Sequence, residues 1–251
     1  EEVGAHVVYG LVGYKTHCKI CLVVRQEAEG IRRYCHLATG NYNARTSGIY
    51  SDFGLFTCRE TFGQDLTELF NLLTGYTRPQ KFSHLLLAPL GLREYFLTQI
   101  RKEAEIARSG RPARLIAKVN SLIDPTLIDE LYIASRAGVQ IDLIVRGMCS
   151  LRAGVPGLSE RIRVLSVVDR YLEHARMFYF HNGGEPLYFL ASADWMPRNF
   201  DRRVEIAFPV IEPALQNRLK NVLEIQLNDN VKGWWMQPDG RYARSESQSD
   251  N

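Results

Sequence analysis

An internal repeat of chemically reactive residues constrains this chain more than any other feature. Each copy contains a histidine, a cation two positions later, an amide or acid after a small-residue turn, and a carboxylate further along. These residues are His17, Lys19, Asn41 and Asp52 in the first copy, and His174, Arg176, Asp194 and Glu205 in the second. The amide or acid precedes its carboxylate by eleven positions in both copies. A histidine–cation pair, a polar turn residue and a carboxylate follow in the same order in both copies, which predicts two similar lobes rather than a chance match.

Short β-rich runs and amphipathic helices fill both copies, which indicates an α/β fold. The expected strands are Ala5–Leu11, His17–Val24, Arg33–Ala38, Leu115–Val119, Gln140–Arg146, Ile162–Val167, Glu173–Phe180 and Leu187–Ser192. The expected helices are Asp65–Leu73, Leu92–Ser109, Pro125–Arg136 and Pro213–Leu227. Because fewer residues precede the histidine in the first copy than in the second, we expect the first lobe to be truncated at its N-terminus. We therefore predict a partial first domain over 1–82 and a second domain over 83–251 that includes the connecting helix.

Composition excludes several classes of protein. With 251 residues, 45% of them hydrophobic, the chain can bury a sizeable core. Lys and Arg outnumber Asp and Glu by only 31 to 28, which is too small an excess for a dedicated nucleic-acid-binding face. Any anion site must therefore be local. Since no signal-type segment or membrane-length apolar run is present, we expect a cytoplasmic protein that does not span a membrane.

The five cysteines are odd in number and lack zinc-type spacing. Cys18 and Cys21 form a C-x-x-C pattern, but the alternation of side chains along a strand would point them to opposite faces. We expect all five to be buried free thiols in a reducing compartment.

The spacing of each histidine and its cation favours phosphoryl chemistry. On a strand, His17 and Lys19 share one face, as do the histidine and arginine of the second copy. A neutral imidazole can attack phosphorus, and a nearby cation can hold the phosphoryl oxygens. A carboxylate on the other ring nitrogen would fix the tautomer, and we assign Asp52 and Glu205 to that duty. His17 is the predicted nucleophile, and His174 is the predicted general acid or base.

Other polar residues are candidates for lining a basic groove, although each also has an ordinary structural interpretation. A single histidine on a strand is more often structural than catalytic. The turn at Asn41 can expose backbone N–H groups to phosphate, but such turns are common. His36 has no counterpart in the second copy and either lines the site or is purely structural. The cations expected to line the groove are Lys19, Lys118, Arg146, Arg176 and Arg198.

Six strings in the sequence carry a resemblance to a known family. They are KTHCK at 15–19, HLATGNYN at 36–43, YSD at 50–52, VRGMCSL at 145–151, DRYLEH at 169–174 and SADWM at 192–196. With these strings, the chain resembles the type 1 polyphosphate kinase family over nearly its whole length. The resemblance fades after Gly233.

The resemblance implies two phospholipase D-like catalytic domains that act on ATP and inorganic polyphosphate. It implies that His17 is the phosphorylated histidine, that Tyr50, Arg146 and His174 contact ATP, and that His174 is the acid or base. His36 matches a second histidine of the family motif, and its role stays open. The resemblance also implies Mg²⁺ as cofactor, with ligands outside this chain and no metal ligand within it. Nucleic acid is not an expected partner, and the full-length enzyme is expected to be a homo-oligomer.

Two other functions remain possible at this point. One is a phospholipase D-like phosphodiesterase or nuclease, which would need no nucleotide. Arg176 stands where that enzyme class usually has lysine, and the carboxylates come later than in its motif, which favours phosphoryl transfer. The other is an inactive fragment of the kinase, because a lost βα unit would remove site residues and expose a sheet edge.

Overall fold

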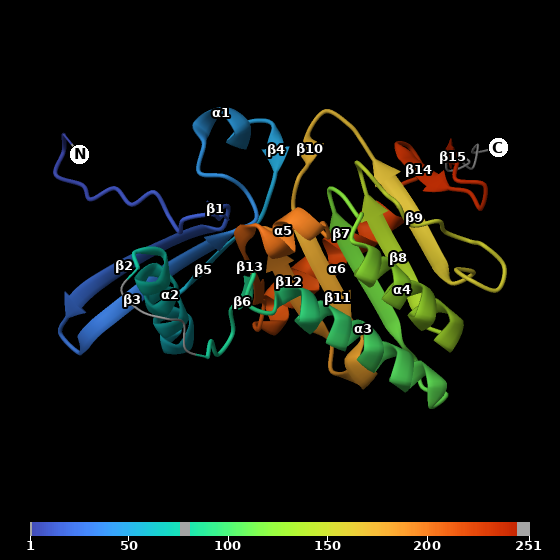
Figure 1. The fold of residues 1–251 in the computed structure, drawn as a ribbon, viewed down its shortest axis with the longest axis horizontal. Coiled ribbons are helices and arrows are strands. Elements are labelled where there is room, and N and C mark those ends of the chain that lie inside the picture. Colours follow the sequence, from blue (N-terminus) through green and yellow to red (C-terminus); the bar gives the residue numbers. More distant parts are fainter. Residues whose placement is uncertain (1, 76–80, 245–251) are drawn as a thin grey trace.

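The computed structural model describes residues 2–75 and 81–244, which form a mixed α/β structure with one long sheet and a smaller one beside it (Figure 1). In the long sheet, β6 (Leu86–Ala88) pairs with β13 outside the main order. The main order is β1 (Lys15–Thr16), β13 (Arg203–Pro209), β12 (Leu187–Ala191), β11 (Arg176–Phe180), β7 (Arg114–Val119), β8 (Gln140–Val145), β9 (Ile162–Val167), β14 (Gly233–Met236) and β15 (Tyr242–Arg244).

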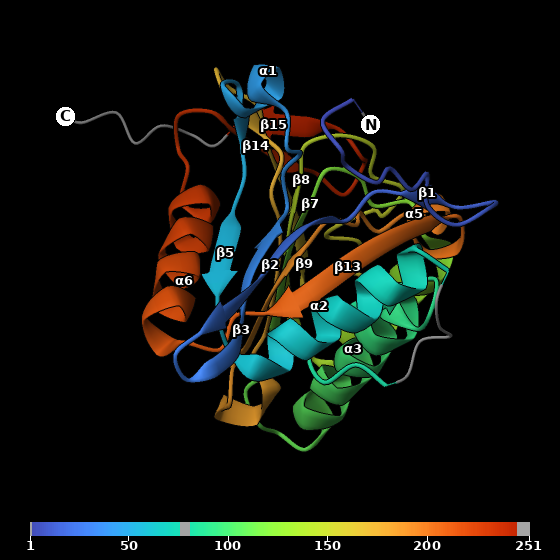
Figure 2. The same ribbon diagram turned by 90° about the vertical axis from the view of Figure 1, so that its left-hand side faces the viewer.

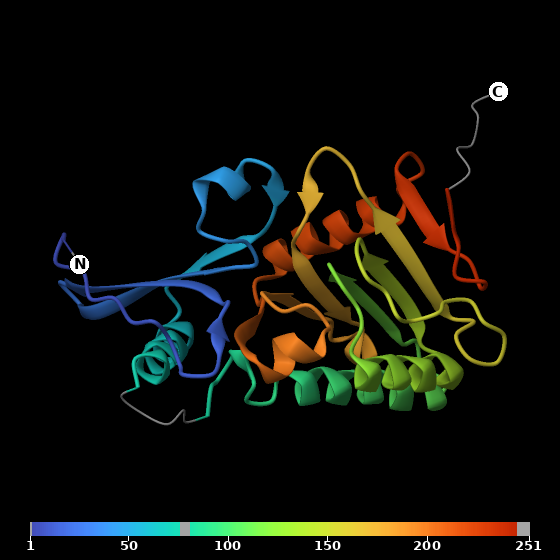
Figure 3. The same ribbon diagram turned by 45° about the horizontal axis from the view of Figure 1, so that its top comes forward.

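Helices cover both faces of the long sheet. α3 (Leu92–Arg108) and α4 (Pro125–Ala137) lie on one face, and α6 (Pro213–Leu227) lies on the other (Figures 2 and 3). α4 begins where the side chain of Asp124 accepts a hydrogen bond from the backbone N–H of Leu127 at 3.1 Å, with proline in the first turn. Apolar side chains from both sheet faces are buried beneath these helices, so β7 and β8 lie in the middle of the core.

The first half of the chain forms a three-stranded antiparallel sheet of β2 (Lys19–Glu27), β3 (Gly30–Ala38) and β5 (Gly54–Thr57). α2 (Glu60–Leu73) packs on one face of this sheet. Alternate residues of β3 are buried on that side, because period-two alternation presents them to the apolar stripe of the helix. The remaining short elements are α1 (Ala44–Ser47), β4 (Tyr50–Ser51), β10 (Leu172–Glu173), the 3₁₀ turn Asn182–Gly184 and α5 (Pro197–Asp201).

Two short parallel pairings join the halves, and they have the same register. β1 pairs with β13, so that the residue before His17 lies opposite Val204, the residue before Glu205. β4 pairs with β10, so that the residue before His174 lies opposite Ser51, the residue before Asp52. Each half therefore places the strand that leads to its histidine against the strand that leads to the other half's carboxylate. Figure 1 shows the β4–β10 pair between the two halves.

Most of the expected elements are present, but one strand was wrong. Residues 5–10 contain no strand, and Val8 and Tyr9 are exposed there. Apolar composition suggested a strand, but among the described residues no neighbouring backbone pairs with this segment. α2 begins at Glu60, five residues earlier than expected.

The expectation that all five thiols are buried was also wrong. Cys35 is buried, Cys18 and Cys149 are partly buried, and Cys21 and Cys58 are exposed. Cys21 lies on the face of the small sheet that α2 does not cover, which explains its exposure. Within the two described stretches, no helix is both long enough and apolar enough to cross a bilayer.

Candidate active site

His17 lies at a break between β1 and β2, where the backbone N–H groups of His17 and Cys18 both donate to the carbonyl of Val204, at 2.9 and 3.0 Å. This break turns the imidazole toward the other half of the molecule. Its Nδ1 lies 2.8 and 2.9 Å from the two carboxylate oxygens of Glu205. The Nζ atom of Lys19 lies 3.0 Å from Nε2 on the opposite side of the ring. The ring is thus held between an acid and a cation.

His174 occupies the same position in the second half. The backbone N–H groups of His174 and Ala175 both donate to the carbonyl of Ser51, at 3.2 and 3.1 Å. Nδ1 of His174 lies 2.9 and 2.8 Å from the two oxygens of Asp52, and the Arg176 guanidinium lies 3.1 Å from Nε2. The predicted carboxylates therefore do contact the predicted histidines, and each carboxylate belongs to the opposite half.

A buried hydroxyl supports each carboxylate. Thr39 Oγ1 donates to Asp52 at 2.7 Å and accepts from the Phe53 backbone N–H at 3.0 Å. Ser192 Oγ donates to Glu205 at 2.5 Å and accepts from the backbone N–H of the following residue, Ile206, at 3.1 Å. These hydroxyls were not among the predicted site residues. The small-residue turns of the repeat carried the signal, because each hydroxyl precedes its carboxylate by the same number of positions.

The hydrogen bonds fix the tautomer of the second ring. An arginine side chain can only donate, so Nε2 of His174 is the acceptor and Nδ1–H donates to Asp52. The contacts of His17 with Lys19 and Glu205 have the same pattern. In both rings, a lone pair on Nε2 therefore faces the cation. This is the form in which an imidazole can attack phosphorus or take up a proton.

Both histidines belong to one cluster, because Arg176 donates to the carbonyl of Thr39, the residue after the Ala38 that pairs with Lys19. Burial lowers the pKa of His174, the charges of Arg176 and Lys19 lower it further, and Asp52 opposes them. Burial also lowers the pKa of Lys19 to about 8, while the charge of Glu205 raises it and that of Arg176 lowers it. Each cation thus acts across the boundary between the halves. The side chains of His17 and His174 are 19% and 10% exposed, so both rings remain open to solvent.

The predicted cations differ in how freely they can bind an anion. Arg176 is buried and forms two hydrogen bonds with Asp194, at 3.0 and 3.2 Å. Lys118, predicted to line the groove or its rim, is only 2% exposed, and its Nζ lies 3.2 Å from Glu173. The prediction for Lys118 was wrong, because both faces of the central strand β7 are buried in the core. Arg198 is exposed on α5, and among the described residues no side-chain contact joins it to the cluster.

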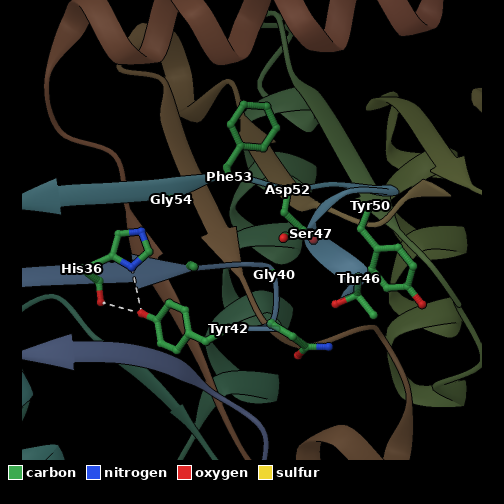
Figure 4. A pocket seen from close by; sticks show the side chains of 11 residues that line it. His36, Gly40, Tyr42, Thr46, Ser47, Tyr50, Asp52, Phe53 and Gly54 are labelled. Carbon is green, nitrogen blue, oxygen red and sulfur yellow. Dashed lines mark hydrogen bonds between the residues drawn. The ribbon is translucent and has the colours of Figure 1, made fainter. Parts of the chain in front are cut away.

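A cavity of about 260 Å³ is lined by Tyr50 and Asp52, two residues that contact the imidazole of His174 (Figure 4). Tyr50 forms one wall and packs against the imidazole of His174, with ring centroids 4.8 Å apart. Asn41 and Asp52 also line this cavity. A side chain at Gly40 would lie 2.4 Å from the carboxyl of Asp52, so only glycine allows this close approach.

His36 lies at the far end of this cavity. Its Nδ1 is 2.8 Å from the hydroxyl of Tyr42 (Figure 4). Its ring packs on Phe56 with centroids 4.3 Å apart. Burial lowers the pKa of His36. No described contact joins His36 to either histidine of the cluster, so it lines the cavity without belonging to the paired arrangement.

The carboxylates of the cluster do not fit a Mg²⁺ site. Asp52 and Glu205 each face an imidazole nitrogen, and Asp194 faces Arg176. Mg²⁺ prefers free oxygen ligands in octahedral geometry. Across residues 2–75 and 81–244, no group of three or more His, Cys, Asp or Glu is arranged to hold a metal ion.

Comparisons with known proteins agree with the resemblance found in the sequence. The family described as polyphosphate kinase C-terminal domain 2 matches residues 85–251, and polyphosphate kinase C-terminal domain 1 matches residues 1–79. The chain is 57% identical to a polyphosphate kinase of Thermosynechococcus vestitus and 55% identical to one of Synechocystis, each over 97% of this chain. It covers 33% and 34% of those two proteins, so it spans about a third of their length.

A solved structure agrees as well. The crystal structure of polyphosphate kinase from Porphyromonas gingivalis superposes with a TM-score of 0.88 at 39% identity, over 96% of this chain and 37% of that one. Both halves of the chain are therefore accounted for by one family. The chain belongs to the polyphosphate kinase family, in which it corresponds to the two C-terminal domains.

Proposed function

We propose that this chain is the catalytic part of an ATP:polyphosphate phosphotransferase that works through a phosphohistidine. One observation carries the proposal: two imidazoles, each oriented by a carboxylate from the other half and each contacted by a cation, lie in one cluster. The family membership supports the same substrates, ATP and inorganic polyphosphate. The division of the chain at residues 82 and 83, a cytoplasmic location and a homo-oligomeric full-length enzyme are parts of this proposal.

In the first step, Nε2 of His17 attacks the γ-phosphorus of ATP. The bond between the γ-phosphorus and the oxygen bridging to ADP breaks as the N–P bond forms, and ADP leaves. Glu205 keeps the proton on Nδ1 and stabilises the cationic phosphoimidazole. Lys19, now beside Nε2, turns to the phosphoryl oxygens. In the second step, the terminal phosphate of a polyphosphate chain attacks the phosphorus and frees the imidazole.

The second imidazole is better suited to moving protons. Arg176 lies against Nε2 of His174 and is held there by Asp194, so a phosphoryl group could reach Nε2 only after this ion pair had broken. Protons need no such space. We therefore assign the nucleophile to His17 and the acid or base to His174. Burial and the two cations keep His174 neutral near pH 7, ready to accept a proton.

The cavity beside His174 is the proposed entrance for ATP. Tyr50, Arg146 and His174 are the proposed nucleotide contacts, and Asn41 adds an amide to the same wall. Mg²⁺ is proposed to arrive with the nucleotide, where it would shield the phosphate charge. Because the carboxylates described above are engaged with imidazoles or arginine, its protein ligands would come from outside this chain.

Labelling with γ-³²P ATP tests the proposal in the full-length protein. We expect acid-labile label on the wild type, none on His17→Ala, and normal label on a control variant of an exposed histidine, His6→Ala. Label that persists in His17→Ala would refute the assignment of the nucleophile. Cleavage of a chromogenic phosphodiester without ATP would favour the phosphodiesterase alternative. If the 251-residue chain alone is inert in both assays while the full-length protein takes up label, the chain is an inactive fragment of the kinase.

A further inference from the structure

Asn120, directly after β7, forms hydrogen bonds with His174 and with two residues near it, Asp194 and Arg146. Its Nδ2 donates to the carbonyl of His174 at 3.1 Å and to the Asp194 carboxylate at 3.1 Å. Its Oδ1 accepts from Nε of Arg146 at 2.5 Å. Asn120 is only 7% exposed. A buried amide with both ends engaged in this way fixes the relative positions of its partners.

Asp194 extends the same network to the second cation. Its carboxylate accepts from the backbone N–H of Asn120 at 2.7 Å and from Nε and a terminal nitrogen of Arg176. Burial acts to raise the pKa of Asp194, but Arg176 and the bonds from Asn120 outweigh it, so the pKa is lowered and the group stays ionised. We name Asn120 and Asp194 together the Asn120–Asp194 clamp.

The backbone after Arg146 is also fixed to this clamp. The N–H of Gly147 donates to the carbonyl of Asn120 at 2.9 Å. A side chain at Gly147 would lie 2.6 Å from that carbonyl oxygen, so the two segments could not approach as closely with any other residue. Of the Arg146 guanidinium, only Nε has a hydrogen-bond partner among the described residues, which leaves both terminal nitrogens available to an anion.

The first half has no equivalent of this arrangement among the described residues. The position that matches Asp194 in the repeat is Asn41, which is neutral, exposed and part of the cavity wall. Lys19 therefore has His17 as its hydrogen-bonding partner, and the fixed network of charges belongs to the second half alone.

We propose that Asn120 is a positioning residue that holds the nucleotide-contacting guanidinium of Arg146 at a fixed place beside the His174 imidazole. The inference rests on the proposed function, because it takes ATP phosphate as the ligand of Arg146. Oδ1 of Asn120 sets ATP affinity through Arg146. Nδ2 sets the turnover rate, because it supports the backbone of His174 and, through Asp194, the position of Arg176.

A double-mutant cycle tests this role in the full-length protein, with calorimetric titration of a non-hydrolysable ATP analogue as the measurement. We expect Asn120→Ala and Arg146→Ala each to raise Kd by roughly tenfold or more, the order found when a supporting hydrogen bond is removed. If Asn120 acts through Arg146, the double variant will bind no more weakly than Arg146→Ala alone. Effects that multiply in the double variant would overturn the proposal.

The variant Asn120→Asp separates the two ends of the amide. It keeps an oxygen for Arg146 but replaces the side-chain N–H donors to His174 and Asp194 with a carboxylate oxygen that repels both acceptors. We therefore expect Kd near the wild-type value and kcat reduced by roughly 10- to 100-fold. A merely structural role would lower kcat and the binding stoichiometry only in proportion to the folded fraction, which thermal unfolding measures. If Asn120→Ala does not fold, Asn120→Ser, which also withdraws the amide oxygen from Nε of Arg146, takes its place in the cycle.

Asp142→Asn serves as the matched control. Asp142 is a buried carboxylate on β8 that pairs with Arg114 and Arg163 and has no described contact with the clamp. Its effect on Kd should multiply with that of Arg146→Ala. A wild-type protein that neither binds the analogue nor takes up label would refute the proposed function as well. A wild type that does both, with multiplying effects at Asn120, would refute only the positioning role.

Discussion

The two halves of the molecule build the same arrangement around a histidine but differ in how tightly the cation is held. In the first half, Lys19 contacts the Nε2 atom of His17 and has a pKa lowered to about 8. In the second, Arg176 contacts the Nε2 atom of His174 while Asp194 holds it in place. Identical imidazole–carboxylate geometry therefore need not mean identical chemistry. The freedom of the neighbouring cation decides whether a phosphoryl group can reach Nε2 of His17 or Nε2 of His174.

Replacing a carboxylate that contacts an imidazole should have the largest effect on kcat. We expect Glu205→Gln to reduce kcat by about 10³- to 10⁴-fold, the order seen when a carboxylate that orients a catalytic histidine becomes an amide. An amide can donate to Nδ1 and so favours the wrong tautomer. The ¹⁵N shifts of the His17 ring should report that change, which a purely structural role would not produce.

Asp52→Asn is the matched variant in the second half. We expect the same tautomer change in His174 but a rate of His17 labelling less affected than in Glu205→Gln. Equal losses of labelling in the two variants would contradict the division of roles between the halves.

Lys19→Arg tests the role of the first-half cation through the pH dependence of kcat. Lys19 must be charged to hold phosphoryl oxygens, and its pKa lies near 8, so wild-type kcat should fall as pH rises through that value. An arginine stays charged over this range, so the variant should lose that limb of the profile, whatever its absolute rate. A descending limb that survives unchanged in Lys19→Arg would assign the titration to another group.

The supporting hydroxyls provide the smallest effect. Thr39→Val and Ser192→Ala each remove one donor to a carboxylate that keeps its contact with the imidazole. We expect reductions in kcat of roughly three- to tenfold, since a typical hydrogen bond contributes about 1 kcal/mol. Ser192→Ala should slow His17 labelling more than Thr39→Val does, because its carboxylate faces the nucleophile. A larger loss of labelling in Thr39→Val than in Ser192→Ala would contradict the assignment of His17 as the nucleophile.

Much of the fold followed from periodicity, because buried strands and amphipathic helices have distinct patterns. Segments such as Leu115–Val119 and Pro213–Leu227 agree closely with β7 and α6. The wrong strand at Ala5–Leu11 shows the limit, since a strand needs a partner that local sequence does not specify. The predicted strands His17–Val24 and Glu173–Phe180 are each interrupted at the histidine, because two successive N–H groups turn to one carbonyl.

The site was predicted in its members but not in its connections. The repeat identified Asp52 and Glu205, yet nothing in their spacing indicated that each would serve the histidine of the other half. Lys118 was misassigned, because a lysine in a strand gives no sign of a partly buried acid such as Glu173 beside it. Asn120 was missed as a site residue, although a polar residue directly after a buried apolar strand is a signal that could have found it.

The pairing of β1 with β13 and of β4 with β10 joins each histidine to the carboxylate of the other half, which constrains how the two copies can evolve. A substitution that removes Asp52 or Glu205 from one half impairs the histidine of the other half, so the two copies of the duplication cannot diverge independently. Polypeptides carrying 1–82 and 83–251 separately would each present mismatched partners, and only their mixture could restore two complete pairs.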